Sequence, residues 1–248
     1  MIREARWLLV GCTLGAALVC MLLPSSAQPP GTSEDPLFNT FSLVAYDPDA
    51  QEWGVVVTSK VPSLRNSVPW AKAGVGAVAT QASTNKQFGP DGLMWLAKGK
   101  SPEEIAKIFQ DADAKIDVRQ FGIVDAKGNS LSFTGKKCGV WAGHKFGKNY
   151  ACQGNLLAGE AVVNDTAKTF EETKGSLALR LMAALEAGNK AGGDKRTTKI
   201  QSSAMIVVHD NSGGQGGVAD YVIDLKVDKS MSPVEDLRKL LTEKLEKK

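Results

Sequence analysis

Thr40 is the residue whose context offers the most direct chemistry in this chain. It begins the strand-forming run Thr40–Tyr46, immediately after the segment QPPGTSEDPLFN. A threonine that becomes N-terminal is both nucleophile and base, because its α-amine, with a pKa of about 8, can take the proton of its own hydroxyl. The alternative is structural, since β-branched residues commonly begin strands. Thr40 is therefore a candidate nucleophile only if the chain before it is removed.

Two further polar groups have a functional and a structural interpretation. His144, close to Trp141, has the chemistry of a general base, although a lone histidine beside an aromatic residue is commonly structural. Asp194 and Arg196 follow two glycines and place both signs of charge on a flexible turn. Such a turn suits the binding of a carboxylate or an amide, with a solvated loop as the alternative.

Residues 1–27 have the pattern of a secretory signal peptide. Arginines precede an apolar run over 7–23, and small residues end at Ala27, which predicts cleavage before Gln28. We therefore expect a secreted or periplasmic protein with a flexible leader or propeptide over residues 28–39. The alternatives are an uncleaved signal anchor, which is the only membrane contact expected, and lipidation at Cys12.

Export would leave Cys138 and Cys152, two of the four cysteines, in an oxidising compartment. We expect a disulfide between them. The alternative is a catalytic or metal-binding thiolate, which needs a partner. The two histidines, His144 and His209, do not have the spacing of a zinc site, and no metal is expected.

The glycine motifs predict no cofactor. Gly74-x-Gly76-x-x-Ala79 loosely matches a dinucleotide fingerprint, but β-like residues follow it where a helix is required, which favours close backbone packing. The run Gly213–Gly217 has the composition of a mobile hairpin tip, with anion binding as the alternative. Sequences of the G-x-S-x-G, H-E-x-x-H and Walker types do not occur, which disfavours serine-triad hydrolases, zincins and P-loop enzymes.

The elements that must position these residues alternate between strands and helices. Runs 40–46 and 53–59 flank a turn and predict a hairpin, and a third strand is expected at 74–81 after a proline-containing loop. Helices are expected around 93–97 and 105–109, the second with Ser101 as N-cap, Pro102 and Glu104. Further strands are expected at 120–124, 130–134, 203–209 and 218–227, a helical pair at 160–187, and a last helix from Ser232.

Hairpins with short turns require antiparallel pairing, and paired helices stack on the outer faces of sheets. The order therefore predicts an α+β fold, a four-layer αββα sandwich of two antiparallel sheets flanked by helices, as a single domain over residues 40–248. With 43% hydrophobic residues the chain can bury a core, and a net charge of only +3 argues against a nucleic-acid partner.

Five ordered blocks resemble the bacterial family called domain of unknown function 1028: TFSLVA at 40–45, GVGAVATQ at 74–81, RQ-x-GIVD at 119–125, QGN at 153–155 and AGGD at 191–194. The resemblance runs from Thr40 to about Leu241. It implies the fold of the N-terminal-nucleophile (Ntn) hydrolase superfamily, which agrees with the element order above. It also implies a catalytic Thr40, with Lys60 in the position of a lysine that lowers the nucleophile's pKa. The polar residues of the family-like blocks would line the substrate pocket: Thr80, Gln81, Asn155, Asp194 and Arg196.

Two functions are compatible with the sequence. The first is a secreted amidohydrolase that cleaves a small amide or peptide with an N-terminal threonine. In cytosolic relatives this threonine follows the initiator methionine, whereas here cleavage before Gln28 leaves residues 28–39 covering the amine. The alternative is therefore a non-catalytic extracytoplasmic binding or assembly protein that retains the fold. A homo-oligomer is compatible with both.

Overall fold

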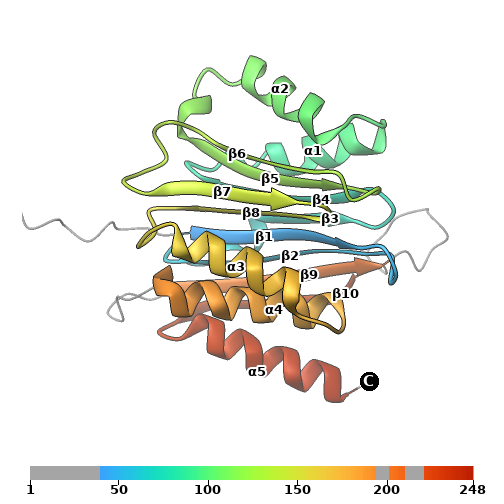
Figure 1. Cartoon of the computed structure of the whole chain (residues 1–248), viewed down its shortest axis with the longest axis vertical. Coiled ribbons are helices and arrows are strands. Elements are labelled where there is room, and N and C mark those ends of the chain that lie inside the picture. Colours follow the sequence, from blue (N-terminus) through green and yellow to red (C-terminus); the bar gives the residue numbers. More distant parts are fainter. Residues whose placement is uncertain (1–39, 194–200, 210–220, 248) are drawn as a thin grey trace, which may run out of the picture. The chain divides into compact units, whose positions relative to one another are not determined.

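The computed structural model describes residues 40–193, 201–209 and 221–247 (Figure 1). The expected signal peptide, the leader over 28–39, Asp194, Arg196 and the tip Gly213–Gly217 lie outside these residues. Ten strands form two sheets in the described part: β1 (Thr40–Asp47), β2 (Glu52–Ser59), β3 (Pro69–Lys72), β4 (Gly76–Ala82), β5 (Arg119–Asp125), β6 (Ser130–Thr134), β7 (Ala142–Gly147), β8 (Tyr150–Asn155), β9 (Gln201–His209) and β10 (Tyr221–Ser230).

One sheet has six strands in the order β10–β9–β2–β1–β8–β7, and the other has four in the order β3–β4–β5–β6. Every described pair is antiparallel. Five α-helices accompany the sheets in the described residues: α1 (Phe88–Ala97), α2 (Pro102–Ala112), α3 (Ala161–Glu172), α4 (Leu177–Gly188) and α5 (Pro233–Glu246).

Three apolar clusters pack these elements together in four layers. The first joins the six-stranded sheet to α3, α4 and α5, and the third joins the four-stranded sheet to α1 and α2. The second cluster fills the space between the two sheets. Figure 1 shows α1 and α2 on one side of the paired sheets and α3, α4 and α5 on the other. The predicted α+β sandwich of two antiparallel sheets flanked by helices is confirmed.

Alternation along β1 determines which layer each side chain enters. Phe41 and Leu43 pack in the cluster with the helices, whereas Val44 packs in the cluster between the sheets. Since successive side chains of a strand point to opposite faces, Thr40 and Ser42 share the inter-sheet face with Val44. All eight residues of β1 are buried, and β1 and β2 are the two middle strands of the six-stranded sheet.

The local signals for turns and caps are confirmed. Asp47 ends β1 and accepts hydrogen bonds from the backbone of Asp49 and Ala50, which closes the predicted hairpin turn. The N-terminus of α2 has the full capping box between Ser101 and Glu104, with Pro102 as the first helical residue.

The proline-containing loop contains a strand that the sequence pattern did not reveal. Pro69–Lys72 forms β3 at the edge of the four-stranded sheet, where a proline at the first position loses no ladder hydrogen bond. The expected strand at 74–81 begins at Gly76, whose φ is +150°. A Cβ atom at Gly76 would lie 2.4 Å from the carbonyl oxygen of Val124, so the glycine serves close backbone packing, as predicted.

In the described residues, no helix combines the length and apolar character needed to cross a lipid bilayer.

Candidate functional site

The candidate site begins with a row of polar residues at the ends of four neighbouring strands. Asn155 on β8 pairs with Thr40 on β1, Thr40 pairs with Ser59 on β2, and Ser59 pairs with Ser202 on β9. Paired residues of antiparallel strands place their side chains on the same face of the sheet. The row therefore lies on the inter-sheet face, at one end of the sandwich.

Thr40 lies in the middle of this row and is 6% exposed. Its hydroxyl oxygen lies 2.7 Å from the hydroxyl oxygen of Ser59. The Ser59 oxygen also accepts a hydrogen bond of 3.1 Å from the backbone N–H of Val61. Lys60 follows Ser59 directly and is 5% exposed. Lys60 is thus the residue that follows the strand partner of Thr40.

The facing sheet contributes a second polar row. Gln81 on β4, Gln120 on β5 and Thr134 on β6 are register partners. The Gln81 amide nitrogen donates a hydrogen bond of 2.8 Å to Gln120 Oε1, and Gln81 Oε1 accepts one of 2.7 Å from the hydroxyl of Ser42. Polar side chains of the two sheets are therefore bonded to each other across the interior.

Gln120 is the centre of these contacts and is fully buried. Its Oε1 accepts from Gln81 and, at 2.9 Å, from the side-chain nitrogen of Asn155. Its Nε2 lies 2.8 Å from the carbonyl oxygen of Gly154 and 3.2 Å from that of Gly143, and donates to Thr134 as well. A buried amide with every polar atom satisfied rigidifies its surroundings.

Gln153 completes the network one pleat below Asn155. Its Nε2 donates a hydrogen bond of 2.6 Å to the hydroxyl of Ser42, and its Oε1 accepts one of 3.0 Å from the hydroxyl of Ser132. Gly122 makes room for this side chain, because a Cβ atom there would lie 2.1 Å from Gln153 Oε1. The glycine in the RQ-x-GIVD block therefore has a packing role.

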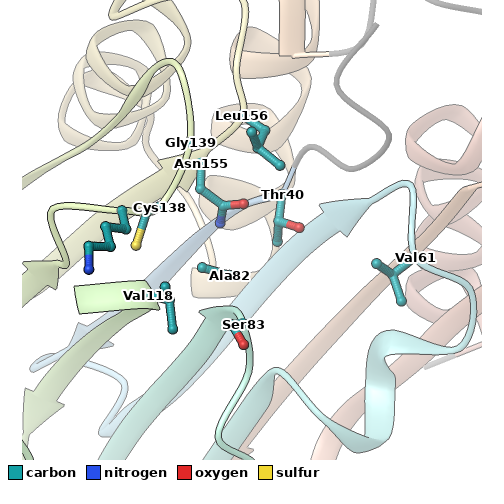
Figure 2. Close-up of a pocket in the computed structure, with 10 residues that line it drawn as sticks. Thr40, Val61, Ala82, Ser83, Val118, Cys138, Gly139, Asn155 and Leu156 are labelled. Carbon is teal, nitrogen blue, oxygen red and sulfur yellow. The ribbon is translucent and has the colours of Figure 1, made fainter. Parts of the chain in front are cut away.

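A cavity of about 570 Å³ opens above this end of the sandwich (Figure 2). Its volume lies in the range of small-molecule sites. Thr40 and Asn155 belong to its wall, together with eight other residues: Val61, Ala82, Ser83, Val118, Lys137, Cys138, Gly139 and Leu156. The wall is mainly apolar, and the ammonium of Lys137 lies 3.9 Å from a carboxylate oxygen of Asp117.

Of the expected site residues, Thr40 and Asn155 belong to the cavity wall. Gln81 does not belong to that wall and lies in the buried polar network, where it bonds to Gln120. Thr80 belongs to neither the wall nor this network. Neighbouring residues of a strand face opposite sides, so Thr80 points away from the inter-sheet face on which Gln81 lies. The Thr80 hydroxyl instead donates a hydrogen bond of 3.1 Å to the carbonyl oxygen of Asn85.

The expected disulfide is absent, because Cys138 and Cys152 are both free and buried. Cys152 packs in the cluster beneath the helices, on the opposite face of β8 from Asn155 and Gln153, whereas Cys138 lines the cavity. The Cys138 sulfur lies 3.2 Å from the carbonyl oxygen of Arg119. Desolvation raises the pKa of the Cys138 thiol, and it raises the pKa of Cys152 to about 12.

His144 lies beside the network and outside the cavity wall. Its Nδ1 is 2.8 Å from the hydroxyl oxygen of Thr134, which also accepts a hydrogen bond from Gln120. Desolvation of part of the ring lowers the pKa of the His144 imidazole. This contact favours the structural interpretation of His144. Among the described residues, no three His, Cys, Asp or Glu side chains are grouped to hold a metal ion.

Sequence reasoning missed Ser42, Ser59, Gln120 and Gln153. Each is a polar residue in a strand that is almost entirely buried, and the signal in the sequence is the spacing of such residues. Thr40 and Ser42 are two residues apart, as are Gln153 and Asn155. Polar residues at alternate positions of a buried strand must have partners within the protein, and this pattern identifies the face on which the site lies.

Comparisons with known proteins agree with this domain. A sequence model of a family of unknown function (DUF1028) matches residues 40–237. A crystal structure of a protein from Silicibacter pomeroyi, assigned to the same family model, has a TM-score of 0.73 and 25% sequence identity. The similarity covers 83% of this chain and 88% of that chain. No curated protein matches the chain.

Proposed function

The chain belongs to the DUF1028 family, and from the geometry of its site we propose that it is an amide-bond hydrolase of the Ntn type with Thr40 as its nucleophile. The observation that carries this proposal is the position of Thr40. It is the first residue of the fully buried strand β1, its hydroxyl is hydrogen-bonded to Ser59, and it forms part of the cavity wall. The family match also begins at residue 40.

The proposed reaction requires that the peptide bond between Asn39 and Thr40 be cut first. The freed α-amine then takes the proton of the Thr40 hydroxyl, and Oγ1 attacks the amide carbonyl carbon. The C–N bond breaks as the amine returns the proton to the leaving nitrogen, which leaves an ester on Thr40. Water attacks this ester, the carboxylic acid departs, and Oγ1 regains its proton. The positive charge of Lys60 would favour the neutral amine.

The lining of the cavity supports our proposal for the chemical class of the substrate. Its walls at Val61, Val118 and Leu156 favour an apolar acyl group, and Lys137 suits an anionic group of the leaving part. A small amide or peptide fits both conditions. We propose that the protein meets it in a secreted or periplasmic location, after removal of residues 1–27 and then of 28–39. A homo-oligomer remains compatible with this function.

Intact mass and N-terminal sequencing of the exported protein test the first requirement, a chain that begins at Thr40. The second test compares Thr40→Ala with Thr40→Ser on a panel of N-acyl amino acids and dipeptides. Loss of hydrolysis in Thr40→Ala with retention in Thr40→Ser supports the nucleophile. Full activity in Thr40→Ala excludes it. A stable chain that begins at Gln28 and binds ligands equally well with Thr40→Ala supports the non-catalytic binding protein.

A further inference from the structure

We propose that the side-chain oxygen of Asn155 accepts a hydrogen bond from the freed α-amine of Thr40, and that Gln120 fixes the Asn155 amide in the orientation this requires. The inference rests on the proposed function in one respect, namely that Thr40 becomes N-terminal. It assigns Asn155 to the catalytic amine and makes Gln120 a positioning residue.

The first step is proximity. Thr40 and Asn155 are paired across the β1–β8 ladder, and Asn155 is 2% exposed. The Cα atoms of such a pair are about 4.5–5.5 Å apart, so the Asn155 side chain can reach the backbone nitrogen of Thr40. Figure 2 shows the oxygen of the Asn155 amide turned towards Thr40 and its nitrogen turned away.

The second step is the orientation of Gln120. The backbone oxygens of Gly143 and Gly154 can only accept hydrogen bonds, so the atom of Gln120 that faces them must be its NH₂ group. The other atom, Oε1, therefore faces Gln81 and Asn155. The orientation of this amide follows from two carbonyl groups on the facing sheet, one on β7 and one on β8.

The third step carries this orientation to Asn155. Because Gln120 presents an acceptor, Asn155 must present its donor, and its Nδ2 lies 2.9 Å from Gln120 Oε1. The Asn155 oxygen is thereby directed to the opposite side, towards Thr40. Among the described residues, no donor is hydrogen-bonded to this oxygen. Asn155 thus offers Thr40 an acceptor.

The fourth step is the demand for that acceptor. A peptide nitrogen carries one hydrogen, whereas a protonated α-amine carries three, and Thr40 is buried. Buried donors require partners. Asn155 would accept a hydrogen bond from one of these N–H groups in either form of the amine. In the neutral form, which carries two hydrogens, this contact leaves the nitrogen lone pair free to take the hydroxyl proton. In this arrangement Asn155 does not donate its Nδ2 hydrogen bond to the oxyanion.

The test measures the pKa of the Thr40 α-amine and needs no substrate. The full chain is folded with a site-specific protease sequence in place of residues 34–39 and is then cut before Thr40. The rate of acetylation of the Thr40 amine by acetic anhydride, followed by mass spectrometry against pH, gives the pKa. The variants are Asn155→Ala, Asn155→Asp and Gln120→Leu. Ser132→Ala, which alters the same network on the far side of Gln153, is the matched control.

The proposal predicts that the two Asn155 variants shift the pKa of the Thr40 α-amine in opposite directions. Loss of the acceptor in Asn155→Ala lowers the amine pKa by about 0.4–1 unit, the equivalent of one hydrogen bond. The carboxylate of Asn155→Asp raises it by about 1 unit or more. Gln120→Leu, which lets the Asn155 amide turn, shifts the pKa in the direction of Asn155→Ala, and Ser132→Ala leaves it unchanged.

An amine pKa that both Asn155 variants leave at the wild-type value overturns the inference, even if the cut protein hydrolyses amides. Conversely, opposite shifts in a cut protein that hydrolyses no amide support the contact and refute the proposed function alone. The acetylation profile and the hydrolysis assay therefore distinguish the two failures.

Discussion

The hydroxyl groups of Thr40 and Ser59 are 2.7 Å apart on neighbouring strands, and this contact links the candidate nucleophile to the end of β2. The Ser59 oxygen also accepts the backbone N–H of Val61, whose side chain belongs to the cavity wall. Ser59 therefore connects the rotamer of Thr40 to the segment that shapes the cavity. If Thr40 is the nucleophile, as proposed, Ser59 orients its hydroxyl.

Ser59→Ala is expected to lower the rate of amide hydrolysis by the cut protein about 10- to 100-fold, mainly in kcat. The reason is that a buried hydroxyl left without its partner costs about 1–3 kcal/mol, and each 1.36 kcal/mol corresponds to a factor of ten. Steady-state kinetics measure the change. Ser202→Ala is the control, because Ser202 is the next residue of the same row and bonds to the Val61 carbonyl, without contacting Thr40. Equal kcat values for Ser59→Ala and wild type would contradict the orienting role.

Gly122→Ala is expected to lower the free energy of unfolding by about 2–4 kcal/mol. The added Cβ atom must displace Gln153, which then loses its hydrogen bonds to Ser42 and Ser132. Urea unfolding measures the change. Gly159→Ala is the matched control, since nothing lies within 4 Å of a Cβ atom there, and it should change stability by less than about 0.5 kcal/mol. Similar unfolding midpoints for the two variants would show that Gln153 moves without cost.

Much of this fold follows from local pattern. The hairpin around Asp47, the capping box at Ser101 and the amphipathic helix from Ser232 each depend on interactions within a few residues, and the sequence displays them directly. The layer order follows in turn, because hairpins and helix pairs limit how the elements can stack. The edge strand β3 was hidden because it has only four residues and begins with a proline.

Thr40 and Asn155, which the sequence singled out, lie in the cavity wall, whereas Gln81 lies in the polar network and the connections within that network were not predicted. Gln120 bonds to residues 39 and 35 positions away in the sequence, so its role depends on how the two sheets pair and face each other. Thr80 illustrates the same limit, because a shift of one residue along a strand moves a side chain to the other face. The disulfide was inferred from the expected compartment. In the structure Cys152 packs beneath the helices and Cys138 lines the cavity, so the two cysteines are not bonded.

Tyr150→Phe is expected to change how stability depends on pH above about 9. The Tyr150 hydroxyl is buried and lies 2.5 Å from a Glu171 carboxylate oxygen, and desolvation followed by this hydrogen bond raises its pKa well above the ordinary value of 10. Because the pKa is raised on folding, the protonated Tyr150 hydroxyl contributes fully to the free energy of unfolding below pH 10. This stabilisation is lost as the pH rises from 10 towards the folded-state pKa, because the tyrosine of the unfolded chain releases its proton first.

Urea unfolding of wild type and Tyr150→Phe at several pH values from 8 to 11 measures this effect. The lysines titrate in both proteins and cancel in the difference. The stability advantage of wild type should shrink as the pH rises above 10. A difference between the two proteins that stays constant over this range would contradict a raised Tyr150 pKa.

The two cysteines should remain thiols and should differ in reactivity. In a chain that begins at or after Gln28 they are the only cysteines, so unfolding without reductant should expose two free thiols to a thiol reagent.

In the native protein at pH 8, Cys152 should not react, because it is fully buried and its pKa is raised to about 12. Cys138 also has a raised pKa, but it lines the cavity and should react slowly with a reagent as small as methyl methanethiosulfonate. Mass spectrometry of the labelled peptides, with Cys138→Ser as control, identifies the site. A protein that shows no thiol after unfolding would restore the disulfide and require the loop before β7 to lie against the opposite face of β8.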